Sequence, residues 1–156
     1  MKRRKAREHA LQFLYRIDFS DGTGGKTRSY AKPGELKSEL DSFWNEAGDV
    51  EPEVKSFAED IITGTIKNLE TIDSVIQRIA EKWTLSRIAS IDRNILRLAA
   101  YELLFRKDIP GAVTINEALE IAKKYSTAES ASFINGLLDR IVREYCAKEP
   151  DRKKKK

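Results

Sequence analysis

Hydrophobic positions along this chain recur with the spacing of an α-helix. Near the start, one sector of a helical wheel at 100° per residue collects Ala6, Ala10, Phe13, Leu14 and Ile17. No run of alternating, β-branched residues bounded by turns interrupts this kind of pattern. The sequence therefore predicts an all-α fold of about seven helices.

Glycine and proline residues divide the chain into segments of helical length. Helices are expected over residues 3–19, 35–46, 52–68, 70–83 and 88–106, and residues 20–34, rich in glycine, are expected to form a flexible connection. Thr114 with Glu117, and Ser126 with Glu129, match the capping box and predict the starts of the last two helices. The segment 88–106 is apolar over a wide arc, which is typical of a central helix.

Length and composition predict a single soluble domain. The 156 residues are 40% hydrophobic, which is enough to form a core without metal or disulfides. The single cysteine, Cys146, has no partner for an internal disulfide or a zinc site, which indicates a reducing cytoplasm. No apolar run approaches the roughly 20 residues of a membrane span, and the basic start is not followed by a signal-peptide apolar region.

Positive charge is concentrated at the two ends of the chain. The formal net charge is +4, yet residues 1–8 carry five basic and one acidic residue, and residues 148–156 carry six basic and two acidic residues. The body between them is therefore negatively charged. We expect an all-helical domain over residues 1–147 and a disordered basic tail over 148–156.

The first predicted helix has the composition of a nucleic-acid-binding helix. It carries four basic residues and two further polar or aromatic residues outside the apolar sector: Arg3, Arg4, Lys5, Arg7, Gln12 and Tyr15. An exposed aromatic ring can stack on an unpaired RNA base. A solvated helix end would carry the same charges, so this remains one of two interpretations. In either case Arg4 and Arg7 are expected to be replaceable by alanine without unfolding.

Residues for catalysis are not apparent in the sequence. The lone histidine, His9, has no serine or cysteine pattern beside it, and a position on the helix surface is the simpler interpretation. No pair of carboxylates stands out as an acid/base couple. We therefore expect a binding protein that is not an enzyme and needs no cofactor or metal.

Four separated blocks, in order, resemble the NusB family of bacterial transcription antitermination factors. They are Arg3–Glu8 leading to Gln12–Tyr15, Ile91–Leu103 (IDRNILRLAAYEL), Ile115–Ala118 (INEA) and Phe133–Asp139 (FINGLLD). The resemblance covers nearly the whole chain except the glycine-rich loop and the lysine tail. It implies two packed three-helix-like bundles that bind the boxA element of nascent ribosomal RNA transcripts together with the ribosomal protein NusE. In this family the complex of the protein with NusE helps RNA polymerase read through terminators.

The resemblance also assigns an RNA surface. It carries over to the six residues of the first helix and to Glu129, Ser132 and Phe133 at the start of the last helix. Lys5 stands where the family has arginine. Lysine can still contact a phosphate, but it lacks the bidentate donor geometry of arginine. Glu129 could instead cap its helix, and Phe133 could be peripheral core.

Partners follow from the same resemblance. It places NusE against the central helices and makes Asp92, Arg93 and Tyr101 candidate contacts. A charge pair at a helix start and a core tyrosine are the structural alternatives. Other Nus factors and RNA polymerase are expected as indirect partners. When free, the protein is also expected to form a homodimer through its RNA surface.

Two competing functions remain at this point. The helical domain also resembles the front part of a ribosomal RNA cytosine methyltransferase, but that enzyme needs an α/β domain with a glycine-rich cofactor turn, for which this sequence has no segment. The other alternative is a helical protein-interaction module whose basic ends only keep it soluble. RNA binding discriminates between these interpretations.

Overall fold

The computed structural model describes residues 2–20 and 33–146, and seven α-helices account for most of them. The helices are α1 (Lys2–Ser20), α2 (Pro33–Ala47), α3 (Pro52–Lys67), α4 (Leu69–Ala80), α5 (Ser90–Phe105), α6 (Gly111–Tyr125) and α7 (Ala128–Ile141). A 3-10 turn (Leu85–Arg87) precedes α5, and a π-helical turn (Val142–Cys146) follows α7. No strand occurs in the described part, so the all-α prediction is confirmed. Most of the expected flexible connection and the whole of the basic tail lie outside the described residues.

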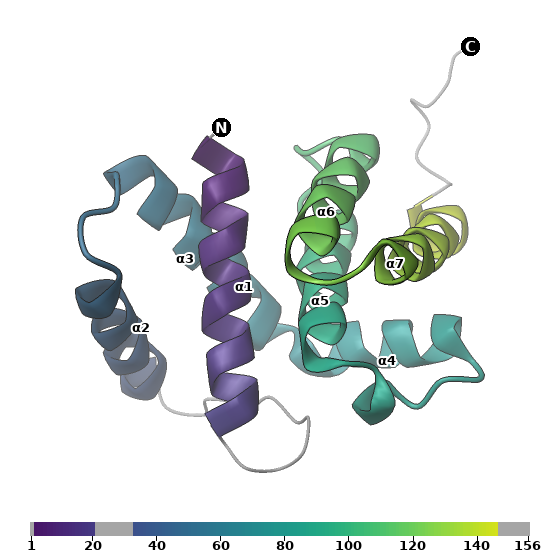
Figure 1. The fold of residues 1–156 in the computed structure, drawn as a ribbon, viewed down its shortest axis with the longest axis horizontal. Helices are drawn as coiled ribbons and strands as arrows, with labels where there is room; N and C mark the ends of the chain where they lie inside the picture. Colours follow the sequence, from purple (N-terminus) through teal and green to yellow (C-terminus); the bar gives the residue numbers. More distant parts are fainter. Residues whose placement is uncertain (1, 21–32, 147–156) are drawn as a thin grey trace.

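The helices form two groups that meet along α1 and α5. Figure 1 shows α1 to α3 on one side and α4 to α7 on the other. Helix α5 contacts α1, α3, α4, α6 and α7, which explains why most of its residues are buried. The predicted central helix is confirmed.

The predicted apolar sector of α1 is the part of the helix that packs. All five of its members, from Ala6 to Ile17, are at most 3% exposed. The ring of Phe13 meets Phe43 of α2 edge-on, with ring centroids 5.4 Å apart. Burial of this sector follows from the hydrophobic effect, because each large apolar side chain removed from water contributes roughly 1.5–3 kcal/mol.

A buried polar cluster joins α1 to α5 within this interface. The Asp18 carboxylate accepts hydrogen bonds from Ser90 Oγ (2.9 Å), Arg93 Nη2 (2.8 Å) and Asn94 Nδ2 (3.0 Å). Burial alone would raise the pKa of Asp18, but the hydrogen bonds from Arg93, Asn94 and Ser90 outweigh it, and the pKa lies below its ordinary value. The cluster thus keeps Asp18 ionised and fixes how the two groups of helices meet.

Three predicted helix ends are wrong. Helix α4 stops at Ala80, because Glu81 adopts a positive φ of 46°. Helix α6 begins at Gly111 rather than Thr114, and α7 begins after Thr127 rather than Ser126. The Thr127 side chain accepts a hydrogen bond from the Ser130 N–H group at 2.9 Å, so Thr127 is the N-cap of α7.

Both predicted capping boxes fail because their residues have other roles. The Thr114 hydroxyl donates to Glu102 Oε1 at 2.8 Å, and Glu117 binds Arg4. Ser126 is the residue that follows the end of α6, and Glu129 is exposed. Partners outside the local pattern bind Thr114 and Glu117, whereas at α7 the neighbouring Thr127 is the N-cap in place of Ser126.

Candidate nucleic-acid interface

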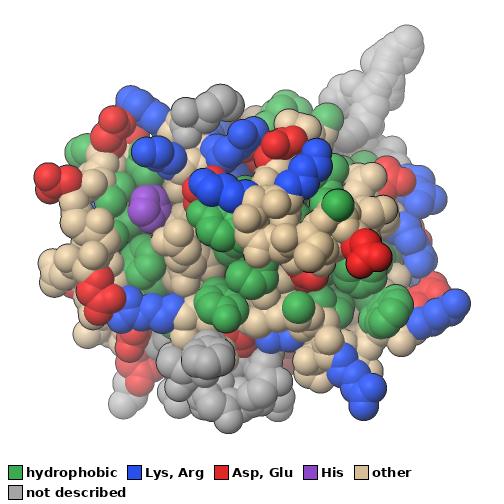
Figure 2. Space-filling model, in the orientation of Figure 1, with side chains coloured by type: hydrophobic (Ala, Val, Ile, Leu, Met, Phe, Trp, Pro, Cys, Tyr) green, Lys and Arg blue, Asp and Glu red, His purple; other side chains and the backbone are tan. Residues whose placement is uncertain are grey.

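The N-terminal end of α1 carries the basic residues that the sequence singled out. Figure 2 shows Lys and Arg side chains gathered around this end and the neighbouring part of α6, with acidic side chains between them. The four basic residues nevertheless have different surroundings. Arg3 and Lys5 are exposed, Arg4 is half-buried and Arg7 is buried.

Arg7 is part of a buried ion pair. Its Nε and Nη2 donate to the two oxygens of Glu102 on α5, at 2.8 Å each, and the side chains are 7% and 1% exposed. The Glu102 carboxylate also accepts the hydroxyl of Thr114 on α6. The expectation that Arg7 lies away from the packed face is wrong. Its guanidinium connects α1 to α5 and α6.

Arg4 is tied to α6 but stays partly accessible. Its Nε and Nη2 donate to the Glu117 carboxylate at 2.7 and 2.8 Å, and the Arg4 side chain is 32% exposed. The hydrogen bond from Arg4 lowers the pKa of Glu117 against the opposing effect of burial. The charge of Arg4 is therefore largely balanced within the protein.

Arg3 lies on another side of α1. Its guanidinium covers the ring of Phe57 on α3, with Cζ 4.4 Å from the ring centroid. A cation over an aromatic face is attracted by the ring quadrupole, so this contact holds the stem of Arg3 while its charge remains at the surface.

An exposed strip on α1 is formed by Lys5, Gln12 and Tyr15. At 100° per residue these three fall within an 80° arc, and Arg4 borders it. Tyr15 is 38% exposed, one of four large hydrophobic residues in the described part with substantial exposure. The expectation that Gln12 and Tyr15 lie outside the core is confirmed. The strip offers a cation, an amide and an aromatic ring on one helix face.

Glu8 connects the end of α6, where the chain leads into α7, to this face of α1. It lies on the same face of α1 and accepts hydrogen bonds from Lys124 Nζ (3.1 Å) and the Tyr125 hydroxyl (3.1 Å) at the end of α6. The short connection from α6 to α7 is thereby held against α1. The sequence analysis missed Glu8, because nothing local relates it to residues more than a hundred positions away.

The three residues predicted at the start of α7 are accessible to different degrees. Glu129 and Ser132 are exposed, and Phe133 is half-buried. The Phe133 ring meets Trp83 edge-on, with centroids 5.8 Å apart. The α1 strip and the start of α7 together form one candidate surface, which we call the α1/α7 surface: Lys5, Gln12, Tyr15, Glu129, Ser132 and Phe133.

The residues predicted to contact a protein partner are mainly interior. Asp92 is 7% exposed and accepts the Ser130 hydroxyl at 2.7 Å, and Arg93 is 3% exposed and binds Asp18. Tyr101 is half-buried and stacks on Phe105 with centroids 5.7 Å apart. Asp92 and Arg93 therefore bind other residues and do not form the predicted charge pair, and Tyr101 is only partly in the core. The part of all three in partner binding stays a prediction.

His9 is not simply a surface residue. Its ring lies half-buried beside Trp44 of α2, with centroids 5.5 Å apart, and its Nδ1 has no hydrogen-bond partner in the described part of the chain. Burial lowers the pKa of His9. Neither a nucleophile nor a carboxylate is bonded to it there, so this environment supports packing rather than catalysis.

The described residues contain no group of three or more His, Cys, Asp or Glu side chains placed to hold a metal ion. In the same part of the chain no helix is long and apolar enough to cross a membrane. The fold is that of an all-helical protein, and the basic, amide and aromatic groups along its helix faces are those that RNA-binding proteins use.

Comparison with known proteins gives the family. Residues 4–143 match the model of the NusB family. A transcription antitermination protein NusB of Thermodesulfovibrio yellowstonii is 50% identical over 145 residues, covering 92% of this chain and 93% of the relative. One from Desulfitobacterium hafniense is 46% identical over 142 residues, covering 91% and 88%. The chain belongs to the NusB family.

Solved structures agree with this assignment. NusB of T. maritima superposes with a TM-score of 0.76 at 41% identity, covering 92% of each chain. A crystal structure of antitermination factors NusB and NusE in complex with dsRNA gives a TM-score of 0.74 at 27% identity, covering 92% of this chain and 98% of the other. The fold of two packed helical bundles is confirmed.

Proposed function

We propose that this protein is a transcription antitermination factor that binds the boxA element of nascent ribosomal RNA transcripts together with NusE. The assembled pair helps RNA polymerase read through terminators. Membership of the NusB family and the similarity to a NusB that was crystallised with NusE and dsRNA support the proposal. The observation that carries it is the α1/α7 surface, which offers cationic, amide and aromatic groups on α1 and at the start of α7, two segments connected through the contacts of Glu8 with the end of α6.

Each group on this surface suits a component of single-stranded RNA. Lys5 and the partly exposed Arg4 beside it attract phosphates, and Arg3, on another side of α1, adds positive charge to the same helix end. Tyr15 and Phe133 offer rings on which bases stack, and such contacts contribute about 1–3 kcal/mol per base. Gln12, Glu129 and Ser132 offer hydrogen bonds to base edges or sugars. Arg7 has a positioning role, because its ion pair with Glu102 fixes the helix that presents the others.

The partner acts beside this surface. The acidic body of the chain suits a basic ribosomal protein such as NusE. Asp92 and Arg93 would shape the partner's site from the interior, and Tyr101 would border it. The protein would act as a binding factor without catalysis, in the cytoplasm where transcripts are made, with other Nus factors and polymerase as indirect partners and a homodimer as the free form.

A titration of boxA RNA with and without NusE tests the proposal. A short basic helix offers few phosphate contacts, so the protein alone is expected to bind weakly and NusE to strengthen binding by adding an adjacent surface. A scrambled RNA of equal length is the control. Equal affinity with and without NusE, or for boxA and scrambled RNA, would contradict the proposal. Binding of NusE without any binding of RNA would indicate a protein-interaction module instead.

A further inference from the structure

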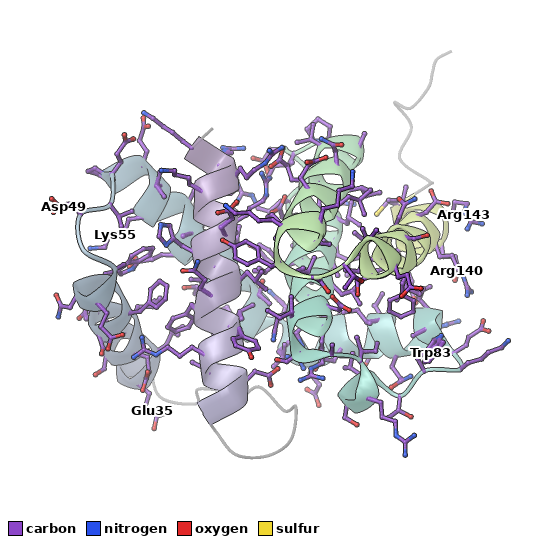
Figure 3. All side chains as sticks on the ribbon, viewed as in Figure 1. Glu35, Asp49, Lys55, Trp83, Arg140 and Arg143 are labelled. Carbon is purple, nitrogen blue, oxygen red and sulfur yellow. The ribbon has the colours of Figure 1, made fainter. Side chains whose placement is uncertain are left out.

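The connection between α4 and α5, residues 81–89, displays an aromatic ring that the proposed function does not use. Trp83 is 55% exposed, more than any other large hydrophobic residue in the described part of the chain. Figure 3 places it beyond the end of α4, on the same side of the molecule as Arg140 of α7. Burying so large a ring in a complex would remove a large apolar surface from water and so favour binding.

The backbone on both sides of Trp83 is held in place. Gln77 Nε2 donates to the Trp83 carbonyl at 2.7 Å, and the Leu85 N–H group donates to Gln77 Oε1 at 2.8 Å. Further along, Arg93 Nη1 donates to the Ile88 carbonyl at 2.6 Å. Because the connection is already ordered, binding through Trp83 would lose little conformational entropy.

Trp83 is also continuous with the α1/α7 surface. Its ring contacts Phe133 edge-on, at an interplanar angle of 78°. Phe133 belongs to the surface proposed to bind RNA, so this contact joins Trp83 to that surface. The two rings form an aromatic pair at the margin of the α1/α7 surface.

The charges of the connection favour RNA over a basic protein. Lys82 and Arg87 are exposed, and neither has an ion-pair partner among the described residues. The one acidic residue of the connection, Glu81, binds Arg140 at 3.3 Å. With two unpaired basic residues and one paired acidic residue, the connection has a net positive charge, which favours phosphates over a basic ribosomal partner.

We propose that Trp83 stacks on an RNA base, with Lys82 and Arg87 contacting the neighbouring phosphates, so that the RNA path continues past α7 onto the connection between α4 and α5. This inference rests on the proposed function, because it lengthens the same RNA-binding surface. It predicts that nucleotides flanking boxA add affinity.

Tryptophan fluorescence tests the contact directly. The chain has two tryptophans, and Trp44 is buried and donates to Glu59, so a Trp44→Phe variant leaves Trp83 as the reporter. Titration with boxA RNA carrying flanking nucleotides is expected to quench this fluorescence by stacking. The matched Trp83→Phe variant, which keeps only Trp44, is expected to show little quenching. Equal quenching in both variants would contradict the proposal.

Affinity measurements provide the second test. Trp83→Ala is expected to weaken binding of the flanked boxA RNA on the order of tenfold, with the salt dependence unchanged because stacking releases no counterions. Phe105→Ala removes another exposed ring, 42% accessible at the end of α5, and is expected to bind like the wild type. Lys82→Ala with Arg87→Ala should instead reduce the salt dependence.

The outcomes separate this inference from the proposed function. If the wild type does not bind boxA RNA, both fail. If the wild type binds it and Trp83→Ala binds equally well, only the present inference fails. Loss of NusE binding by Trp83→Ala with unchanged RNA affinity would show that Trp83 is a protein contact and would overturn the inference.

Discussion

Arg7 and Lys5 lie two residues apart on α1 and have opposite surroundings. Lys5 is exposed, whereas Arg7 is enclosed between α1, α5 and α6 with its charge matched by Glu102. A buried charge that loses its partner remains desolvated, so the two positions differ in what they contribute to stability. For RNA binding the order is expected to be reversed, with Lys5 contributing more than Arg7.

Replacing Arg7 by alanine is expected to destabilise the protein by about 3–5 kcal/mol, because Glu102 would stay buried without its cation. Lys5→Ala is expected to change the free energy of unfolding by less than about 0.5 kcal/mol. Urea unfolding measures both. The double variant Arg7→Met with Glu102→Leu should recover most of the loss. A stable Arg7→Ala protein would mean that the ion pair is not formed.

Tyr15 and Lys5 separate stacking from charge. Tyr15→Ala is expected to weaken boxA binding by about 1–3 kcal/mol with an unchanged salt dependence. Lys5→Ala is expected to weaken binding to every single-stranded RNA and to reduce the slope against salt by about 0.7. Filter binding at several salt concentrations measures both effects.

Tyr15→Phe is the control for the ring, since it removes only the hydroxyl. It is expected to bind nearly as tightly as the wild type. If Tyr15→Ala lowers the melting temperature markedly and leaves RNA affinity intact, the ring has a structural role and the proposed stacking is wrong.

At the scale of elements, α3 and α5 approach each other closely at Gly64. A Cβ atom placed there would overlap the ring of Tyr101. Tyr101 in turn stacks on Phe105 near the end of α5. A side chain at position 64 would therefore displace the Tyr101 ring and disturb its packing on Phe105.

Gly64→Ala is accordingly expected to destabilise the protein by about 1–3 kcal/mol through overpacking. Gly136→Ala is the matched control, because position 136 lies within α7 with nothing within 4 Å of an added Cβ. That change is expected to stabilise by about 0.5–1 kcal/mol. Thermal melts of both variants measure the difference, and a destabilisation shared by the two would argue against the close approach.

At the scale of the whole molecule, the pKa of His9 makes stability depend on pH near neutrality. Burial lowers the pKa of His9 from 6.5, with Glu8 opposing and Lys5 assisting. The unfolded chain therefore binds a proton at this site more readily than the folded protein. Stability is full above about pH 6.5 and declines as the pH falls below it. Asp18, whose folded pKa is also lowered, adds a second loss below its ordinary value of 3.8.

Urea unfolding at pH 8, 7, 6 and 5 is expected to show a plateau followed by this decline. His9→Gln should flatten the curve between pH 7 and 5, and the loss at more acidic pH should remain because Asp18 is unchanged. An equal decline in the variant would assign it to another group.

The sequence by itself determined the all-α fold, the central position of α5 and the face of α1 that packs. These depend on helical periodicity, which is a property of neighbouring residues. It also singled out Gln12 and Tyr15 as exposed, because their angle on the helix excludes them from the apolar sector. The blocks from Arg3 to Asp139 were enough to identify the family.

Only the tertiary structure decided what the charged residues do. Arg4 and Arg7 have the same local pattern as Lys5, but Glu117 and Glu102, about a hundred residues away, bind them and leave Lys5 exposed. The contact with Arg4 also takes Glu117 out of the predicted capping box, and Thr114 donates to Glu102 of α5 instead. Pairing across such distances depends on how the helices pack, so a local pattern could not reveal it, nor the contact that places Trp83 beside Phe133.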